Sequence, residues 1–157
     1  MRLTDHLSLK EVIKSNTATR LGIDNTPTEE HEINLHLVAS EIFEPIRTHF
    51  NVPIGISSGY RGKALNKAIG GSKTSDHCKG MALDMDADMF GKLTNADIFH
   101  YIKDNLEFKQ LIWEFGTDTN PNWVHCSYDI NNNKKEILVA KKIKGRTTYT
   151  HYNDKTI

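Results

Sequence analysis

Hydrophobic residues in the first third of the chain recur at three- and four-residue intervals, the spacing of an amphipathic helix. This stripe consists of Leu35, Val38, Ile42 and Ile46. The segment from Thr26 to Glu29 predicts the helix start, as a capping box with proline at the first helical position. Pro45 predicts a kink near its end. A second capping box, from Ser8 to Glu11, predicts a short helix before it.

The pattern changes to alternation and short apolar runs after residue 53, although two further helices are predicted. Arg61 to Ile69 predicts a short helix that ends at two glycines, and Thr94 to Asp97 begins another, with Ile98, Tyr101 and Ile102 on its buried side. The predicted strands are Ile54 to Ser58, Met81 to Asp86, Gln110 to Phe115, Asn122 to Tyr128 and Glu136 to Ile143.

Helices that precede strands in this order indicate an α+β protein. We expect a small antiparallel sheet with helices packed mainly on one side. The chain has no internal repeat, low-complexity run or linker, so we predict one domain over residues 1–157.

Charge and composition limit the classes of partner that the protein can have. The 20 basic and 20 acidic side chains cancel, and 38% of the residues are hydrophobic, as in ordinary globular proteins. A nucleic-acid partner is disfavoured without a basic excess, and the basic run from Lys134 to Arg146 is interpreted as a strand with a solvated lysine face. No apolar run is long enough for a membrane helix, and residues 1–6 lack a signal-peptide segment. We expect a monomer made in the cytoplasm.

Two cysteines are too few for a disulfide scaffold. Cys78 and Cys126 each follow a histidine directly, and alternation along a strand points them away from that histidine's side. We interpret both as buried small hydrophobic residues, with a mutual disulfide as the alternative.

The densest run of unusual residues lies between Ser75 and Asp84. His77 and Asp84 are seven positions apart, so on one unbroken strand they face opposite sides. Gly80 allows a turn that brings both side chains to one pocket. Beyond the turn, Asp84 alternates with apolar neighbours, which places its carboxylate on the face opposite the core.

Three further residues complete a candidate site. His125 shares a strand face with Trp123 and Ser127, Glu114 interrupts an apolar strand, and Arg61 follows a strand at a glycine-marked turn. Two histidines and a carboxylate with an open fourth position are typical of catalytic zinc. The sequence therefore predicts one Zn²⁺ per chain on His77, Asp84 and His125, with Glu114 as the base.

These residues resemble a known family. Ser75-x-His77-x-x-Gly80-x-Ala82-x-Asp84 is similar to the S-x-H-x-x-G-x-A-x-D signature of zinc D-Ala-D-Ala carboxypeptidases. That family includes D-Ala-D-Ala dipeptidases and phage L-alanyl-D-glutamate endopeptidases, and it shares its fold with hedgehog signalling domains. The resemblance to its compact branch runs from about Leu7 to Tyr149 and includes Ser58-Gly59-Tyr60-Arg61 and Trp123-Val124-His125-Cys126-Ser127.

The resemblance implies zinc-dependent cleavage of peptidoglycan peptides, with His77, Asp84 and His125 as metal ligands. Many members carry the catalytic glutamate just before the last histidine, whereas Glu114 lies eleven residues ahead of His125. Arg61 is implied to bind a substrate carboxylate or the developing oxyanion. The setting implied is a phage or prophage lysis enzyme or a virion component. The alternatives are a metal-stabilised wall- or partner-binding module and a cytoplasmic D,D-dipeptidase.

Overall fold

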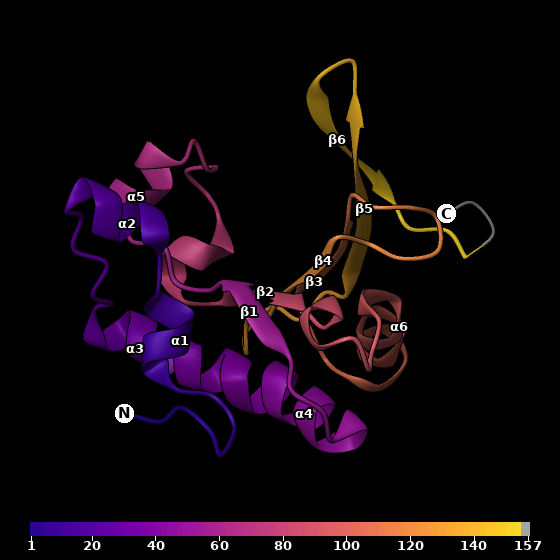
Figure 1. Ribbon diagram of the computed structural model, residues 1–157, viewed down its shortest axis with the longest axis horizontal. Coiled ribbons are helices and arrows are strands. Elements are labelled where there is room, and N and C mark those ends of the chain that lie inside the picture. Colours follow the sequence, from indigo (N-terminus) through magenta and orange to yellow (C-terminus); the bar gives the residue numbers. More distant parts are fainter. Residues whose placement is uncertain (155–157) are drawn as a thin grey trace.

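The computed structural model describes residues 1–154 (Figure 1). Its helices are α1 (Leu9–Ile13), α2 (Asn16–Leu21), α3 (Glu29–Val38), η1 (Ala39–Phe43), α4 (Glu44–Phe50), α5 (Lys63–Ala68), η2 (Asp76–Lys79), η3 (Asp88–Phe90) and α6 (Asn95–Asn105). Its strands are β1 (Gly55–Ser58), β2 (Ala82–Asp86), β3 (Gln110–Glu114), β4 (Trp123–Ser127), β5 (Glu136–Ile143) and β6 (Arg146–His151).

None of the helices within residues 1–154 has both the length and the apolar character needed to cross a bilayer. The predicted domain end at residue 157 lies outside the described residues, and the single domain stays a prediction.

Local capping signals place most helix starts where the sequence predicts them. Ser8 caps α1 and Thr94 caps α6, each with a complete capping box. The predicted start at Thr26 is wrong, because Thr28 caps α3 by accepting a hydrogen bond from the amide of His31. The amide and hydroxyl of Thr26 instead donate to Asp24, which holds this segment in a turn ahead of the helix.

The predicted amphipathic helix is a continuous run of α3, η1 and α4 beneath the sheet (Figure 1). Its middle segment is a π-helix, in which the amide of Glu44 bonds to the carbonyl of Ala39, five residues back. Pro45 follows directly and has no amide proton to continue the α-helical pattern. The kink predicted near Pro45 therefore corresponds to a change from α-helical to π-helical hydrogen bonding just before this residue.

The six strands within residues 1–154 form one sheet in the order β1-β2-β4-β3-β5-β6. Four of the strand pairs within residues 1–154 are antiparallel, as predicted, but β3 and β5 pair in parallel, so the sheet is mixed. The reason is the order of pairing: β4 already lies between β2 and β3, so the returning chain adds β5 to the free edge of β3. Because β5 reverses direction relative to β4, it runs parallel to β3. The overall α+β class is confirmed.

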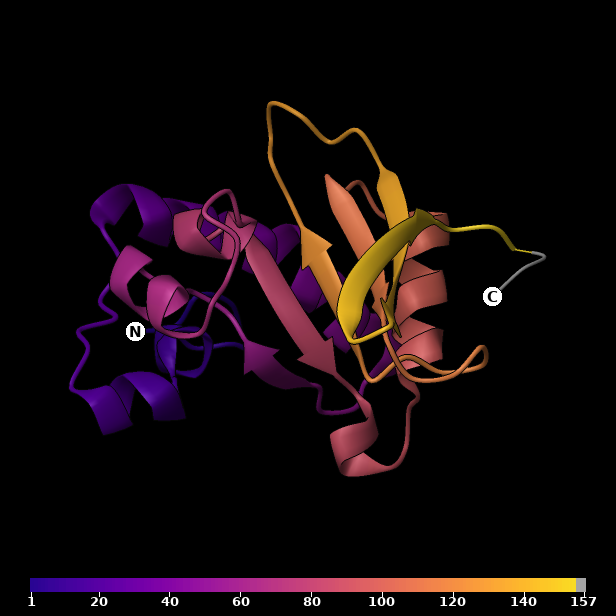
Figure 2. The same ribbon diagram turned by 90° about the horizontal axis from the view of Figure 1, so that it is seen from above.

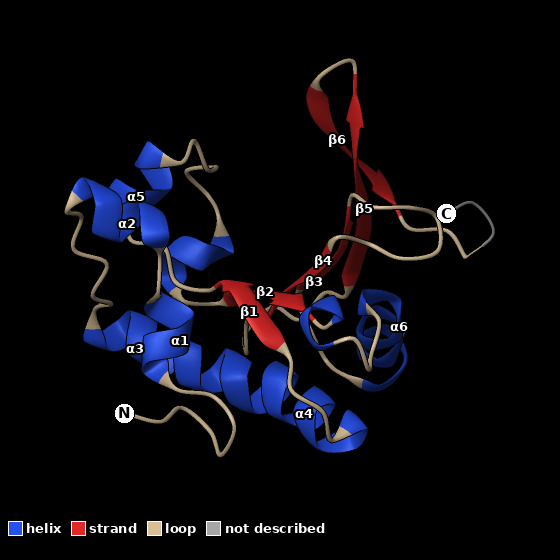
Figure 3. Ribbon diagram, viewed as in Figure 1, coloured by secondary structure: helices blue, strands red, loops and turns tan. Residues whose placement is uncertain are grey.

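The two faces of the sheet have different neighbours. Helices α3, α4 and α6 lie along one side of the strands (Figure 3), and Figure 2 shows α6 beside the strands that follow β2. The buried residues on this side include Leu83, Met85, Leu111, Trp113, Val124 and Cys126. Strict alternation then directs Asp84, Ile112, Glu114 and His125 to the opposite face. Because one face of the sheet packs against the core, the polar residues of a site lie on the opposite face.

Strand β6 has no counterpart in the sequence prediction. It pairs antiparallel with β5 through a two-residue turn at Lys144 and Gly145, both with positive φ. Such turns are the favoured connection in hairpins because their twist matches that of the strands. The β5–β6 hairpin rises away from the helices (Figure 1).

The two cysteines are both free, so the alternative of a mutual disulfide is wrong. Cys126 is fully buried in the core, as predicted from strand alternation. Cys78 is only half-buried, because it lies on the short helix η2 and not on a strand. The alternation argument therefore does not apply to it.

Candidate active site

Three predicted residues form a compact buried cluster above β2 and β4. Asp84 and His125 are direct cross-strand neighbours, and His125 Nδ1 lies 3.0 Å from Asp84 Oδ1. His77 Nε2 lies 3.2 Å from the same carboxylate oxygen. One ligand atom from each residue lies within 4.8 Å of the other two, which allows the group to hold a metal ion.

His77 reaches this cluster from a short 3-10 helix and not from a strand. Gly80 ends that helix in the left-handed conformation, at φ +71°, and a Cβ there would meet the carbonyl oxygen of His31 at 2.4 Å. The predicted break at Gly80 is confirmed, and it turns the chain from η2 into β2 so that His77 and Asp84 face each other.

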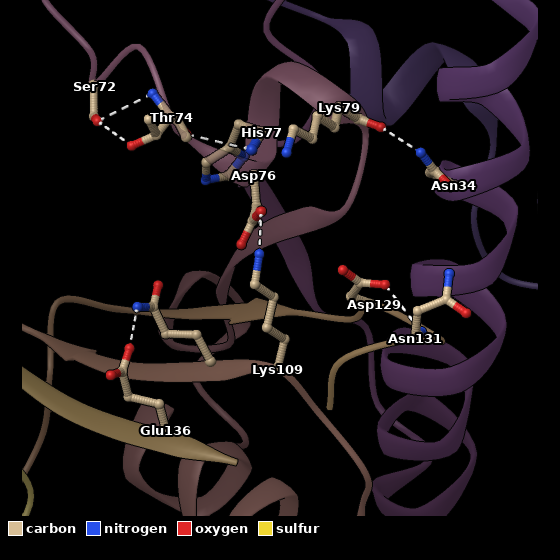
Figure 4. A network of polar contacts seen from close by, with 12 residues as sticks. Asn34, Ser72, Thr74, Asp76, His77, Lys79, Lys109, Asp129, Asn131 and Glu136 are labelled. Carbon is tan, nitrogen blue, oxygen red and sulfur yellow. Dashed lines mark hydrogen bonds and ion pairs between the residues drawn. The ribbon is translucent and has the colours of Figure 1, made fainter. Parts of the chain in front are cut away.

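Polar contacts hold η2 in place on both sides. Lys109 Nζ forms an ion pair with Asp76 Oδ1 at 2.8 Å, which ties η2 to the start of β3 (Figure 4). Asn34 Nδ2 donates to the carbonyl of Lys79 at 2.9 Å, which ties the other end of η2 to α3 (Figure 4). These contacts fix the position of His77 relative to the sheet.

The hydrogen bonds of His77 fit a metal ligand. His77 Nδ1 lies 2.7 Å from the carbonyl oxygen of Gly59, which can only accept, so this nitrogen carries the proton. In the neutral imidazole, Nε2 then presents a lone pair to the carboxylate of Asp84. Two acceptors at this distance repel each other unless a proton or a cation lies between them. A backbone partner on the outer nitrogen is also the usual way to orient a metal-binding histidine.

The electrostatics of the cluster favour positive charge. Burial alone would raise the pKa of Asp84, but the charge of His77 and hydrogen bonds from both histidines bring it well below its usual range. Burial alone would lower the pKa of His125, yet the hydrogen bond and charge of Asp84 raise it. Both shifts stabilise an ionised carboxylate beside a cation, and the donor set of two imidazoles and one carboxylate suits zinc.

Glu114 lies on the same face of the sheet, one strand away from His125. It is 7% exposed, and burial raises the pKa of its carboxyl group to about 7, against the opposing charge of His125. The negative charge of Asp84 acts in the same direction as burial, whereas Arg61 opposes it. A carboxyl group that titrates near neutral pH can both accept and return a proton under physiological conditions.

Arg61 lines the same cleft as the buried cluster. Its amide donates to the carbonyl of His77, its Nη2 donates to Ser75 Oγ at 3.3 Å, and its Nε is buried without a protein partner among residues 1–154. A buried donor without a partner is costly, and a bound anionic group would satisfy it.

All five predicted residues line one cleft of about 700 Å³. Residues 70–72 and 74–77 line one part of this cleft, and residues of the sheet and of the β5–β6 hairpin line the rest. The sequence reasoning missed Thr147 and Tyr149 of the hairpin and Lys109 before β3, which also line it. The Lys144-Gly145 pair after an apolar strand was a usable hairpin signal for the first two.

Comparison with known proteins agrees with this geometry. The family model described as Peptidase M15 matches residues 5–127, which include Arg61, Glu114 and the whole buried cluster. A search of curated proteins gave no match. The match confirms the resemblance to zinc D-Ala-D-Ala carboxypeptidases at the level of the family. The chain therefore belongs to the peptidase M15 family, and its membership indicates a metallopeptidase.

Proposed function

We propose that this protein hydrolyses peptide bonds in peptidoglycan stem peptides or cross-links, with zinc as its cofactor. The observation that carries the proposal is the shared cleft: a buried His-Asp-His group that can hold a metal lies beside a carboxyl group with a pKa of about 7. A purely structural metal site has no use for such a base, which argues against the alternative of a binding module.

Each residue then has a defined task. His77 through Nε2, His125 through Nδ1 and Asp84 through its carboxylate would hold the zinc ion. When bound, zinc supplies a Lewis acid that polarises a carbonyl group and lowers the pKa of a coordinated water. Glu114 takes up the proton from the attacking water and passes it to the leaving amine. Arg61 binds a carboxylate of the substrate with its guanidinium group.

The substrate class rests on family membership and on the shape of the cleft. Ligand sites usually have volumes of about 300–1,000 Å³, and the cleft of about 700 Å³ can take a peptide longer than a dipeptide. This size favours a stem peptide over a free D,D-dipeptide. The setting in a phage or prophage lysis enzyme, the monomeric state and the choice between carboxypeptidase and endopeptidase stay predictions.

The test uses the zinc-loaded protein and purified peptidoglycan. We expect release of new amino groups, and mass spectrometry of the released fragments identifies the bond. Glu114→Gln should keep one zinc per chain and lose hydrolysis, whereas Glu41→Gln, at an exposed position on η1, should keep both. Turnover in the Glu114 variant would assign the base to another residue. Turnover on D-Ala-D-Ala but not on intact sacculi would establish the dipeptidase instead.

A further inference from the structure

The β5–β6 hairpin forms a wall of the cleft that the proposed chemistry does not use. The hairpin lies outside the residues that the family model matches, which end at residue 127. Thr147 and Tyr149 on β6 line the same cleft as Asp84, Glu114 and His125. The hairpin is therefore placed where a bound substrate would contact it.

Strand register places Tyr149 in line with the predicted base. Glu114 on β3 pairs with Ala140 on β5, and Ala140 pairs with Tyr149 on β6. Residues paired in this way point to the same face of a sheet, and neighbouring strands are about 4.8 Å apart. Because Ala140 has only a methyl group, no large side chain stands between Tyr149 and Glu114 along this row.

The side chain of Tyr149 is not held by the core or by a hydrogen bond within the described residues. The residue is 53% exposed, and no hydrogen bond of its hydroxyl group is seen within residues 1–154. Burial raises the pKa of its phenol group, and the negative charges of Glu114 and Asp84 raise it further. Both effects on the pKa are expected if the phenol ring points toward the site and not away from it.

Two aliphatic side chains lie near Tyr149 on the floor of the cleft. Ile112 pairs with Leu138 in the next row of the sheet, and both residues line the cleft. A strip of aliphatic side chains next to a tyrosine hydroxyl suits a peptide, since the strip can contact small aliphatic side chains while the hydroxyl bonds to a main-chain group.

We propose that the β5–β6 hairpin carries a substrate-binding subsite, in which the hydroxyl group of Tyr149 hydrogen-bonds to the main chain of a peptide lying over Ile112 and Leu138. The inference rests on the proposed peptidase function, because it assigns a second binding wall to the same site. Tyr149 binds substrate and does not take part in proton transfer.

The experiment compares Tyr149→Phe, Tyr149→Ala and Thr150→Ala in the zinc-loaded protein. Thr150 is exposed on the same strand but points to the other face, so it controls for changes in β6 itself. The substrate is a synthetic stem peptide ending in D-Ala-D-Ala, and kcat and KM are measured separately. Zinc content and thermal unfolding of each variant establish that the site and the fold are intact.

We expect Tyr149→Phe to raise KM about three- to tenfold, the effect of one lost hydrogen bond, and Tyr149→Ala to raise it further through lost ring contacts. The kcat value should change much less, and Thr150→Ala should match the unmodified protein. An unchanged KM in both Tyr149 variants would overturn the subsite.

A failure of the proposed function is distinguished by direct binding. If the unmodified protein does not hydrolyse the stem peptide, its affinity is measured by calorimetry with the same three variants. Weaker binding in the Tyr149 variants alone would support the subsite without the peptidase activity. Absence of binding to the unmodified protein, or equal affinity in all variants, would refute it.

Discussion

Replacing Glu114 by glutamine in the metal-free protein should change how its stability depends on pH. Burial raises the pKa of this carboxyl group from its ordinary value of 4.5 to about 7. The folded protein therefore holds the proton more tightly than the unfolded chain does. The stabilising contribution of the protonated group is complete below about pH 4.5 and is lost as the pH rises through about 7.

The magnitude follows from the size of the pKa change. A rise from 4.5 to about 7 corresponds to about 3 kcal/mol at 1.36 kcal/mol for each pKa unit. The attraction of His125 is already included in this change, because it lowers the pKa of Glu114 against the effect of burial. The full figure is an upper bound, since it is reached only when the pH change spans both pKa values. Glutamine has almost the same shape and does not titrate, so its own burial cost is the same at every pH.

The assay is urea unfolding of both proteins in the presence of a chelator, at pH 5 and at pH 8. The free energy of unfolding of Glu114→Gln, relative to the unmodified protein, should rise by up to about 3 kcal/mol between the two conditions. Glu41→Gln controls for the removal of an exposed carboxylate. A difference that stays constant with pH would refute the claim that burial perturbs Glu114.

Three further outcomes test the site and its supports. Asp84→Asn should lose stoichiometric zinc in elemental analysis, because a neutral amide cannot balance the cation; a full equivalent of zinc would move the metal site elsewhere. Gly80→Ala should cost about 1–3 kcal/mol in denaturant unfolding, since its Cβ would strike a carbonyl oxygen of α3. Gly91→Ala, at φ +69° with open space around it, should cost less, and equal losses would exclude the steric clash. Asn95→Ala should cost about 1–3 kcal/mol, because the buried amide bonds to main-chain groups that flank β2 and β4. Asn105→Ala is its exposed control.

The sequence by itself determined the features that depend on neighbouring residues. The caps at Ser8 and Thr94 and the alternation of β2 are short-range patterns, and the structure agrees with them. The spacing around Gly80 and the two histidines likewise identified the residues that converge in the cleft. That convergence is now seen, while their catalytic and metal-binding roles stay predictions.

Only the tertiary structure decided the features that depend on distant partners. The parallel pairing of β3 with β5 follows from which sheet edge was still free, and this is not encoded in either strand alone. The pKa of Glu114 depends on burial and on charges from β2, β4 and the loop before α5. Tyr149 faces the site through a register across three strands. Local patterns can be read along the chain, whereas strand partners, burial and electric fields arise from long-range contacts and exist only in the folded protein.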